Sequence, residues 1–166
     1  MKAIYYEQHG TAVVLQDGEP TNPEPHDNLV LDDMVHTSVN LIYPRFRYAE
    51  QQEYITCTFP VDPGWDLAGK IAKVGAKVTD WQVGDEVLGL AFTWSIQHGS
   101  YAEYCPIDTA SITEKPASIS FEQAAALPLV SLTAWQALSE FGELKAGQSV
   151  FIQAGAGGVG SVAIPM

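Results

Sequence analysis

Residues 149–160 read Ser-Val-Phe-Ile-Gln-Ala-Gly-Ala-Gly-Gly-Val-Gly, an apolar run that leads into the pattern Gly-x-Gly-x-x-Gly. This combination is typical of a strand that passes into a phosphate-binding turn and then into the first helix of a dinucleotide-binding domain. Glycines suit such a turn because a backbone without Cβ atoms bends tightly and brings its amides close to a pyrophosphate. We therefore predict a nucleotide-binding turn over Gly155, Gly157 and Gly160.

The sequence ends at Met166, six residues after Gly160. The residue that distinguishes a ribose hydroxyl from a ribose phosphate is expected about 20 residues beyond the glycines. We therefore expect a chain that holds the first part of a nucleotide-binding domain and binds the nucleotide weakly by itself. Pro165 falls within the expected helix, where it would remove a backbone hydrogen bond. A natural truncation and a piece of a longer protein both fit this pattern.

Composition narrows the class of protein. With 166 residues, 46% of them hydrophobic, the chain can form one small domain and part of a second. Eight Lys and Arg against 20 Asp and Glu give a net charge of -12, which argues against a nucleic acid or an anionic membrane surface as partner. Neither a leader-like segment nor an apolar run of about 18 residues is present, so we expect a cytoplasmic protein.

The first part of the sequence reads as an all-β domain. Up to about Lys115, short apolar or alternating runs are separated by Gly, Pro and Asp turns, which is typical of a barrel or sandwich. The expected strands are residues 2–6, 12–16, 29–39, 67–74, 86–91 and 101–106. In the third, Asp32 and Asp33 are adjacent, so one of them points inward unless a bulge intervenes.

The pattern changes to helical after Pro116. Ser120-Phe121-Glu122-Gln123 is a capping box and predicts a helix start, and Pro128 is suited to the first turn of a second helix that runs to Gly142. The following turn leads to the expected strand 149–153. We therefore divide the chain into residues 1–117 and residues 118–166.

Several landmarks occur together in an order that resembles the medium-chain dehydrogenase/reductase superfamily, and within it the zinc-free quinone oxidoreductase (zeta-crystallin-like) branch. They are Met1–Ile4, Pro63–Gly69, Val83–Val87, Gly99–Tyr104, Ala124–Pro128, Leu132–Ala134 and the terminal glycines. The resemblance implies a mixed β and α/β fold, in which a GroES-like β-barrel catalytic domain (1–117) precedes the first βα step of a Rossmann fold (118–166). It also implies NADPH, or less typically NADH, lying between the two domains, a quinone or enone substrate reduced by hydride, and a homodimer as one option.

The resemblance also assigns site residues. The cofactor-binding positions are Thr133, Gly155, Ala156, Gly157, Gly158, Val159 and Gly160. Asn40 and Tyr43 fall in the family's substrate-binding segment, where Tyr43 replaces an aspartate, Ala49 replaces a glycine and Gln51 replaces an aromatic residue. No residue is assigned as a catalytic acid or base. Four aromatic residues, Tyr43, Tyr48, Tyr54 and Trp94, form either a stacking wall for a flat substrate or ordinary packing.

Zinc chemistry is not expected. Zinc-dependent relatives carry Gly-His-Glu where this sequence has Gly64-Trp65-Asp66, and a cysteine near the position of Asn40, so two ligand types are missing. The four histidines are scattered at positions 9, 26, 36 and 98 and are expected at the surface or in turns. Cys57 and Cys105 have no base nearby in the sequence and are expected to be unreactive.

Two alternatives remain. One is a non-catalytic GroES-like fragment that acts through association with another chain, which fits the incomplete nucleotide-binding domain. The other is a zinc-type alcohol dehydrogenase, which the missing ligands disfavour.

Overall fold

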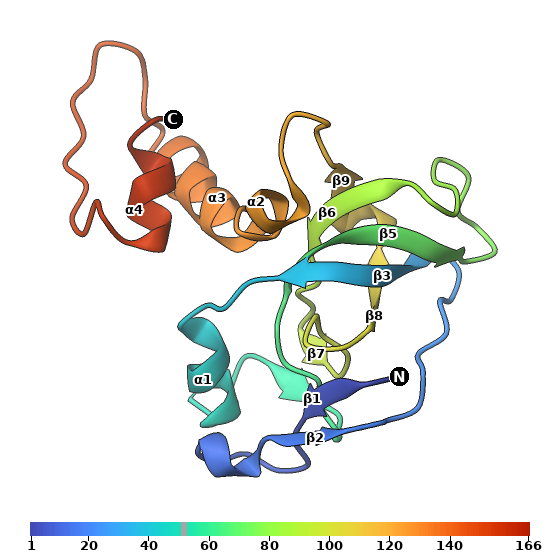
Figure 1. Cartoon of the computed structure of the whole chain (residues 1–166). Coiled ribbons are helices and arrows are strands. Elements are labelled where there is room, and N and C mark those ends of the chain that lie inside the picture. Colours follow the sequence, from blue (N-terminus) through green and yellow to red (C-terminus); the bar gives the residue numbers. More distant parts are fainter. Residues whose placement is uncertain (51–52) are drawn as a thin grey trace.

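The computed structural model describes residues 1–50 and 53–166 and consists of two parts. A β-rich body contains most of the chain, and a helical part formed by the last third projects from its upper edge (Figure 1). The change from β to helical structure after residue 115 confirms the pattern found in the sequence. None of the helices in the described ranges is both long and apolar enough to cross a bilayer.

A five-stranded antiparallel sheet in the order β8-β3-β5-β6-β9 forms the centre of the body (Figure 1). Its strands are β3 (Leu29–Thr37), β5 (Asp66–Val74), β6 (Glu86–Leu90), β8 (Tyr104–Asp108) and β9 (Ile112–Glu114). Two small sheets complete the body: β1 (Ala3–Tyr5) with β2 (Gln16–Gly18), and β4 (Thr56–Cys57) with β7 (Ser95–Ile96). Most of the expected strands are present, with ends shifted by a few residues.

The prediction of a strand at residues 12–16 is wrong. Residues Ala12–Val14 form a 3-10 turn, closed by the Val14 amide donating to the Thr11 carbonyl at 3.2 Å, and β2 begins only at Gln16. Val13 is 88% exposed. An apolar run forms a strand only where a neighbouring strand is available, and residues 12–15 have none beside them among the described residues, although Val14 and Leu15 pack against the aromatic core.

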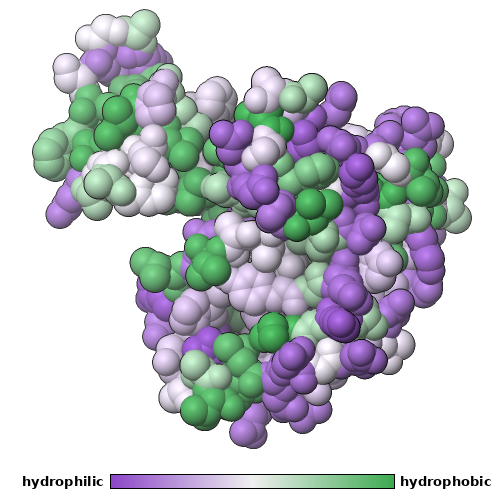
Figure 2. Space-filling view, in the orientation of Figure 1, coloured by the Kyte–Doolittle hydropathy of each residue, from purple (hydrophilic) through white to green (hydrophobic). Residues whose placement is uncertain are grey.

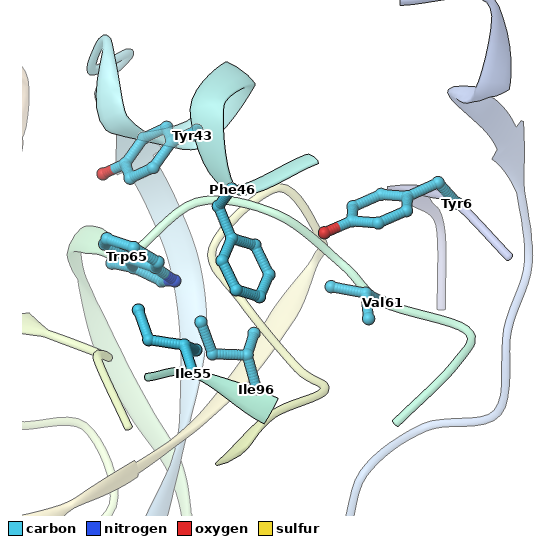
Figure 3. Packing of buried hydrophobic residues seen from close by; sticks show 7 residues of the cluster. All are labelled: Tyr6, Tyr43, Phe46, Ile55, Val61, Trp65 and Ile96. Atoms are coloured by element: carbon cyan, nitrogen blue, oxygen red, sulfur yellow. The ribbon is translucent and has the colours of Figure 1, made fainter. Parts of the chain in front are cut away.

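The core of the body is aromatic where β4 and β7 meet helix α1 (Ile42–Arg47). Figure 3 shows the buried cluster, in which Phe46, Trp65 and Tyr6 lie among smaller aliphatic side chains. Its buried members are Tyr6, Tyr43, Phe46, Ile55, Val61, Trp65 and Ile96. The rings meet edge to face, for example Tyr43 and Trp65 at 5.1 Å between centroids, which is a favoured geometry for aromatic pairs. This packing fixes the orientation of Trp65.

The helical part begins as the sequence predicts. Helix α2 (Phe121–Ala125) has its capping box, with the Gln123 amide donating to Ser120 Oγ at 3.3 Å and the Ser120 amide donating to Gln123 Oε1 at 3.0 Å. Helix α3 (Pro128–Trp135) has Pro128 in its first turn and continues as a π-helical turn over Gln136–Phe141. Helix α4 (Gly158–Ala163) follows the glycines and packs against α3.

The strand expected over residues 149–153 is not formed. Val150 is 51% exposed and Phe151 is 90% exposed, and no other strand lies beside them within the described ranges. A strand of a parallel sheet needs neighbours for its backbone hydrogen bonds, so the apolar run alone cannot make one. Pro165 is also placed differently from the expectation, because α4 ends at Ala163 and leaves the proline outside the helix.

Of the two adjacent acids in β3, Asp32 is the one that points inward. The register shifts on both sides of it, between Leu31 and Asp32 and between Met34 and His36, and its side chain is fully buried. Neither carboxyl oxygen has a hydrogen-bond partner among the described residues. Burial, together with the charge of Asp33, raises the pKa of Asp32 from 3.8 to about 8.

We predict that Asp32 makes the fold less stable as the pH rises. Because the folded pKa lies above the unfolded one, the native state holds an extra proton between about pH 4 and pH 8, and the free energy of unfolding falls across that range. An asparagine at position 32 does not ionise, so the Asp32→Asn protein should lack this decrease in the free energy of unfolding, which is on the order of 3–5 kcal/mol in the wild type. Chemical denaturation of both proteins from pH 5 to pH 9 measures this, and identical pH slopes would contradict it.

Candidate active site

A cleft of about 500 Å³ lies where helix α3 faces the β-rich body. The body contributes Ile42, Ile55, Trp65, Leu90, Phe92 and Trp94, and the helical part contributes Leu129, Leu132, Thr133 and Gln136. The lining is mainly apolar and aromatic, which is the character of pockets that hold flat organic ligands. Hydrophobic residues also cover much of the exposed surface of the helical part (Figure 2).

The aromatic wall of this cleft is formed by a chain of edge-to-face contacts. Trp65 meets Phe92 at 4.9 Å and Phe92 meets Trp94 at 5.2 Å between ring centroids. Trp94 is 69% exposed and is one of the residues that line the cleft. Of the four aromatic residues noted in the sequence, only Trp94 lines the cleft; Tyr43 packs behind Trp65, and Tyr48 and Tyr54 do not contribute.

A buried carboxylate connects the two sides of the cleft. Asp66 Oδ2 accepts hydrogen bonds from Ser38 Oγ and Tyr43 Oη, each at 2.7 Å, and from Asn40 Nδ2. Asp66 Oδ1 accepts the backbone amide of Leu129, in the first turn of α3, also at 2.7 Å. Both oxygens are thus used, one by α1 and the residues just before it, and the other by the helix that carries the opposite wall.

This arrangement compensates the charge of Asp66, which is 1% exposed. A carboxylate removed from water is costly unless hydrogen-bond donors surround it, and charge-assisted hydrogen bonds are the stronger kind. The amide of a helix's first turn also carries a partial positive charge. Asp66 therefore fixes α3 against the body through a contact that is both short and enclosed.

The structure brings Asn40 and Tyr43 together, but around Asp66 rather than on the wall of the cleft. Asn40 Nδ2 lies 3.4 Å from Tyr43 Oη, and Tyr43 is 5% exposed. Burial raises the pKa of the Tyr43 hydroxyl, and the charge of Asp66 raises it further, so the hydroxyl stays protonated as a donor. Ala49 keeps a left-handed backbone with φ of 70°, as the glycine it replaces could; Gln51 lies outside the described residues.

Thr133 lies in the cleft, on α3, with its hydroxyl turned to its own helix. Thr133 Oγ1 donates to the Leu129 carbonyl at 2.7 Å, a common arrangement of threonine within helices. Because α4 packs on α3, the glycine turn before α4 lies on the helical part that carries Thr133.

The glycines of the turn differ in what surrounds them. A Cβ on Gly160 would lie 2.7 Å from the Gly155 Cα, so Gly160 serves the packing of the turn against α4. A Cβ on Gly157 would meet only the Ala154 carbonyl oxygen, at 3.2 Å. Gly157 has φ of -80° and ψ of 172°, a conformation open to any residue. Backbone strain therefore does not explain why residue 157 is a glycine. Beyond the Ala154 oxygen, the space beside it is open to a ligand.

Sequence reasoning missed Asp66, which it considered only as part of a lost zinc motif. The signal was a carboxylate directly between the apolar residues Trp65 and Leu67. Among the described residues, no three His, Cys, Asp or Glu side chains are grouped so as to hold a metal ion. Trp65 is 4% exposed within the aromatic core, and the oxygens of Asp66 are occupied by donors.

A β-rich body followed by a helical part with a glycine turn is the arrangement of a GroES-like domain joined to the start of a nucleotide-binding domain. Residues 34–117 match the alcohol dehydrogenase GroES-like domain. The chain belongs to that family and, through it, to the medium-chain dehydrogenase/reductase superfamily that its motifs resemble. The fold class expected from the sequence is confirmed.

Two relatives that match the whole chain carry the name of a reductase or an oxidoreductase. Over its whole length the chain is 34% identical to the 2-methylene-furan-3-one reductase of Solanum lycopersicum and 36% identical to a chloroplastic NADPH-dependent alkenal/one oxidoreductase of Arabidopsis thaliana. It covers 44% of each of these proteins, so the chain spans about half the length of the curated relatives it matches.

Solved structures give the same result. The quinone oxidoreductase of Coxiella burnetii matches 99% of the chain with a TM-score of 0.87 and 36% identity, and 52% of that structure is covered. The Escherichia coli quinone oxidoreductase in complex with NADPH matches 98% of the chain with a TM-score of 0.82 and 31% identity, and 48% of it is covered.

We predict that Asp66→Asn lowers the free energy of unfolding by about 2–4 kcal/mol, because an amide cannot accept from donors on both of its sides. Ser38→Ala removes only one of the donors and should cost about 1 kcal/mol. Equilibrium denaturation of the two variants gives these values. Equal effects of the two substitutions would show that the contact between Asp66 and α3 contributes nothing of its own.

Proposed function

We propose that this chain is part of an NADPH-dependent reductase that transfers a hydride to a quinone or an enone. The observation that carries the proposal is the apolar, aromatic cleft between the body and α3, on the same helical part as the glycine turn. The names of the relatives support it, since they include an NADPH-dependent alkenal/one oxidoreductase and a quinone oxidoreductase in complex with NADPH.

The two parts of the chain are assigned different functions. We assign residues 1–117 to the catalytic domain and residues 118–166 to the start of the nucleotide-binding domain. The family match that ends at residue 117 and the capped helix that starts at Phe121 support this boundary. Because the relatives are about twice as long, the activity is assigned to a longer protein and the 166-residue chain alone is expected to be inactive.

The residues of the turn fit a dinucleotide. We assign Gly155, Ala156, Gly157, Gly158, Val159 and Gly160 to its pyrophosphate, because the space beside Gly157 is open and the amides there precede α4. Thr133 borders the nicotinamide from the α3 side. When bound, the nicotinamide supplies the hydride, and the protein's part is to orient and to exclude water.

The body holds the substrate. Trp94 and Phe92 offer ring faces and edges on which a flat conjugated molecule can stack, and Trp65 closes the cleft behind them. Asn40 is assigned to the substrate side of the site, and Tyr43 contributes through Asp66 because it is buried. The carbonyl oxygen is then polarised by hydrogen-bond donors or water.

We expect no stoichiometric zinc. The two positions where zinc-dependent relatives place a histidine and a cysteine hold Trp65 and Asn40, whose side chains are poor zinc ligands. Elemental analysis after exhaustive dialysis checks this. One zinc ion per chain would favour the alcohol dehydrogenase alternative.

We predict that Gly157→Val weakens NADPH binding by the full-length protein more than tenfold. Valine can adopt the backbone angles of this position and needs only a small shift of the Ala154 carbonyl, which lies 3.2 Å from the new Cβ, so its branched side chain should fill the space of the pyrophosphate. Calorimetric titration measures the affinity. The control is Gly147→Ala, which strains a turn with φ of 87° and should lower stability while leaving the affinity nearly unchanged. Unchanged affinity in a folded Gly157→Val protein would refute the assignment and favour the non-catalytic alternative.

A further inference from the structure

Cys57 and His9 are 48 residues apart in the sequence and adjacent in the structure. Cys57 Sγ lies 3.5 Å from His9 Nε2, with the cysteine on β4 and the histidine in the segment that follows β1. We propose that Cys57 is a nucleophile that forms covalent adducts with α,β-unsaturated carbonyl compounds, and that His9 is its base. This site is separate from the cleft, because neither residue lines it.

The second ring nitrogen of His9 defines the direction of proton transfer. His9 Nδ1 lies 3.2 Å from the backbone carbonyl oxygen of Arg47, and a carbonyl can only accept a hydrogen bond. In the neutral ring Nδ1 therefore carries the proton, and Nε2 presents its lone pair to the thiol. A nucleophilic side chain is commonly activated by an adjacent base, which a third group holds in the correct orientation.

The ring is also held in place by packing. His9 meets Phe46 at 6.1 Å and Phe59 at 5.2 Å between centroids, both edge to face. Tyr6 adds a third aromatic contact at 6.4 Å, and together with one hydrogen bond to the backbone these rings leave the imidazole little freedom to turn away from Cys57. The pairing is thus a property of the folded chain.

Two further groups lie beside His9: the Arg47 carbonyl oxygen is 3.2 Å from its Nδ1, and the Tyr6 ring centroid is 6.4 Å from that of the imidazole. Arg47 is 8% exposed, its Nε donates only to the carbonyls of Gly10 and Thr11, and it forms no ion pair within the part of the chain that the structure describes. The Tyr6 hydroxyl is buried and has no hydrogen-bond partner among the described residues, and both Cys57 and Arg47 are close enough to influence its charge. The Tyr6 hydroxyl is thus an unused donor close to Cys57, available to a thiolate that forms during reaction.

At rest the sulfur is a thiol, since partial burial raises the pKa of Cys57. The base is therefore needed at the moment of attack. His9 Nε2 takes the thiol proton while Sγ forms a bond to the β-carbon of the electrophile, and the electrons of the C=C bond move to the carbonyl as an enolate. The enolate then takes a proton at its α-carbon from the imidazolium or from water. One S–C bond and one C–H bond form, and nothing is oxidised or reduced.

This corrects the expectation that Cys57 lacks a base. That expectation rested on sequence neighbours, whereas the fold supplies a histidine from near the N-terminus. Cys105 provides a control within the same protein, because it is fully buried and burial raises its pKa strongly. Cys57 is partly exposed and can be reached by a small electrophile.

The test is the rate of modification by N-ethylmaleimide, a Michael acceptor that adds to thiols without losing an atom, in the absence of nucleotide. Mass spectrometry with peptide mapping follows Cys57 and Cys105 separately in the wild-type protein and in His9→Gln. We expect Cys57 to react at least tenfold faster in the wild type than in His9→Gln, and Cys105 to stay unmodified in both.

Local unfolding of the variant would show as modification of Cys105, and a second variant, His9→Asn, then repeats the comparison. The proposal is overturned if Cys57 reacts at the same rate with and without His9 in a protein whose Cys105 is protected. It is also overturned if Cys57 in the wild type reacts no faster than the thiol of a short peptide with the sequence of residues 54–60.

Discussion

The carboxylate of Asp66 is the contact on which the geometry of this protein depends. It is the point where the β-rich body, the segment before α1 and the first turn of α3 meet, and its side-chain oxygens accept four hydrogen bonds from these elements. A buried carboxylate oxygen without a hydrogen-bond donor would lower the free energy of unfolding by several kcal/mol. The positions of the donors and of Asp66 therefore depend on one another. The position of α3, and with it the width of the cleft, follows from this constraint.

The cleft is consequently defined by two kinds of force with different roles. Edge-to-face packing of Trp65, Phe92 and Trp94 gives the body a rigid wall, whereas the opposite wall is attached through a directional contact at the start of α3. Packing resists compression in any direction, but a hydrogen bond to a helix amide also fixes how the helix is rotated. Thr133, one turn beyond Leu129, is placed in the cleft by that rotation.

Local features were predicted correctly from the sequence, and features that need distant partners were not. The capping box at Ser120, the start of α3 at Pro128 and the helix after the glycines depend on residues a few positions apart, and all are present. The run 149–153 looked like a strand because it is apolar, but a parallel strand also needs neighbours. The sequence predicted that one acid in β3 points inward unless a bulge intervenes; the register shifts on both sides of Asp32, and Asp32 points inward nonetheless.

The candidate site was predicted only in part for the same reason. Resemblance pointed to Asn40, Tyr43 and Thr133. The structure places the first two on the Asp66 carboxylate and Thr133 in the cleft, and no sequence spacing connects Asp66 to α3. Hydrogen exchange of the Leu129 amide, followed by NMR, tests this account most directly. If Asp66 holds α3, this amide should exchange at least about 100-fold more slowly than an unprotected one, in step with the amides of β5. Exchange near the unprotected rate while β5 stays protected would contradict the account.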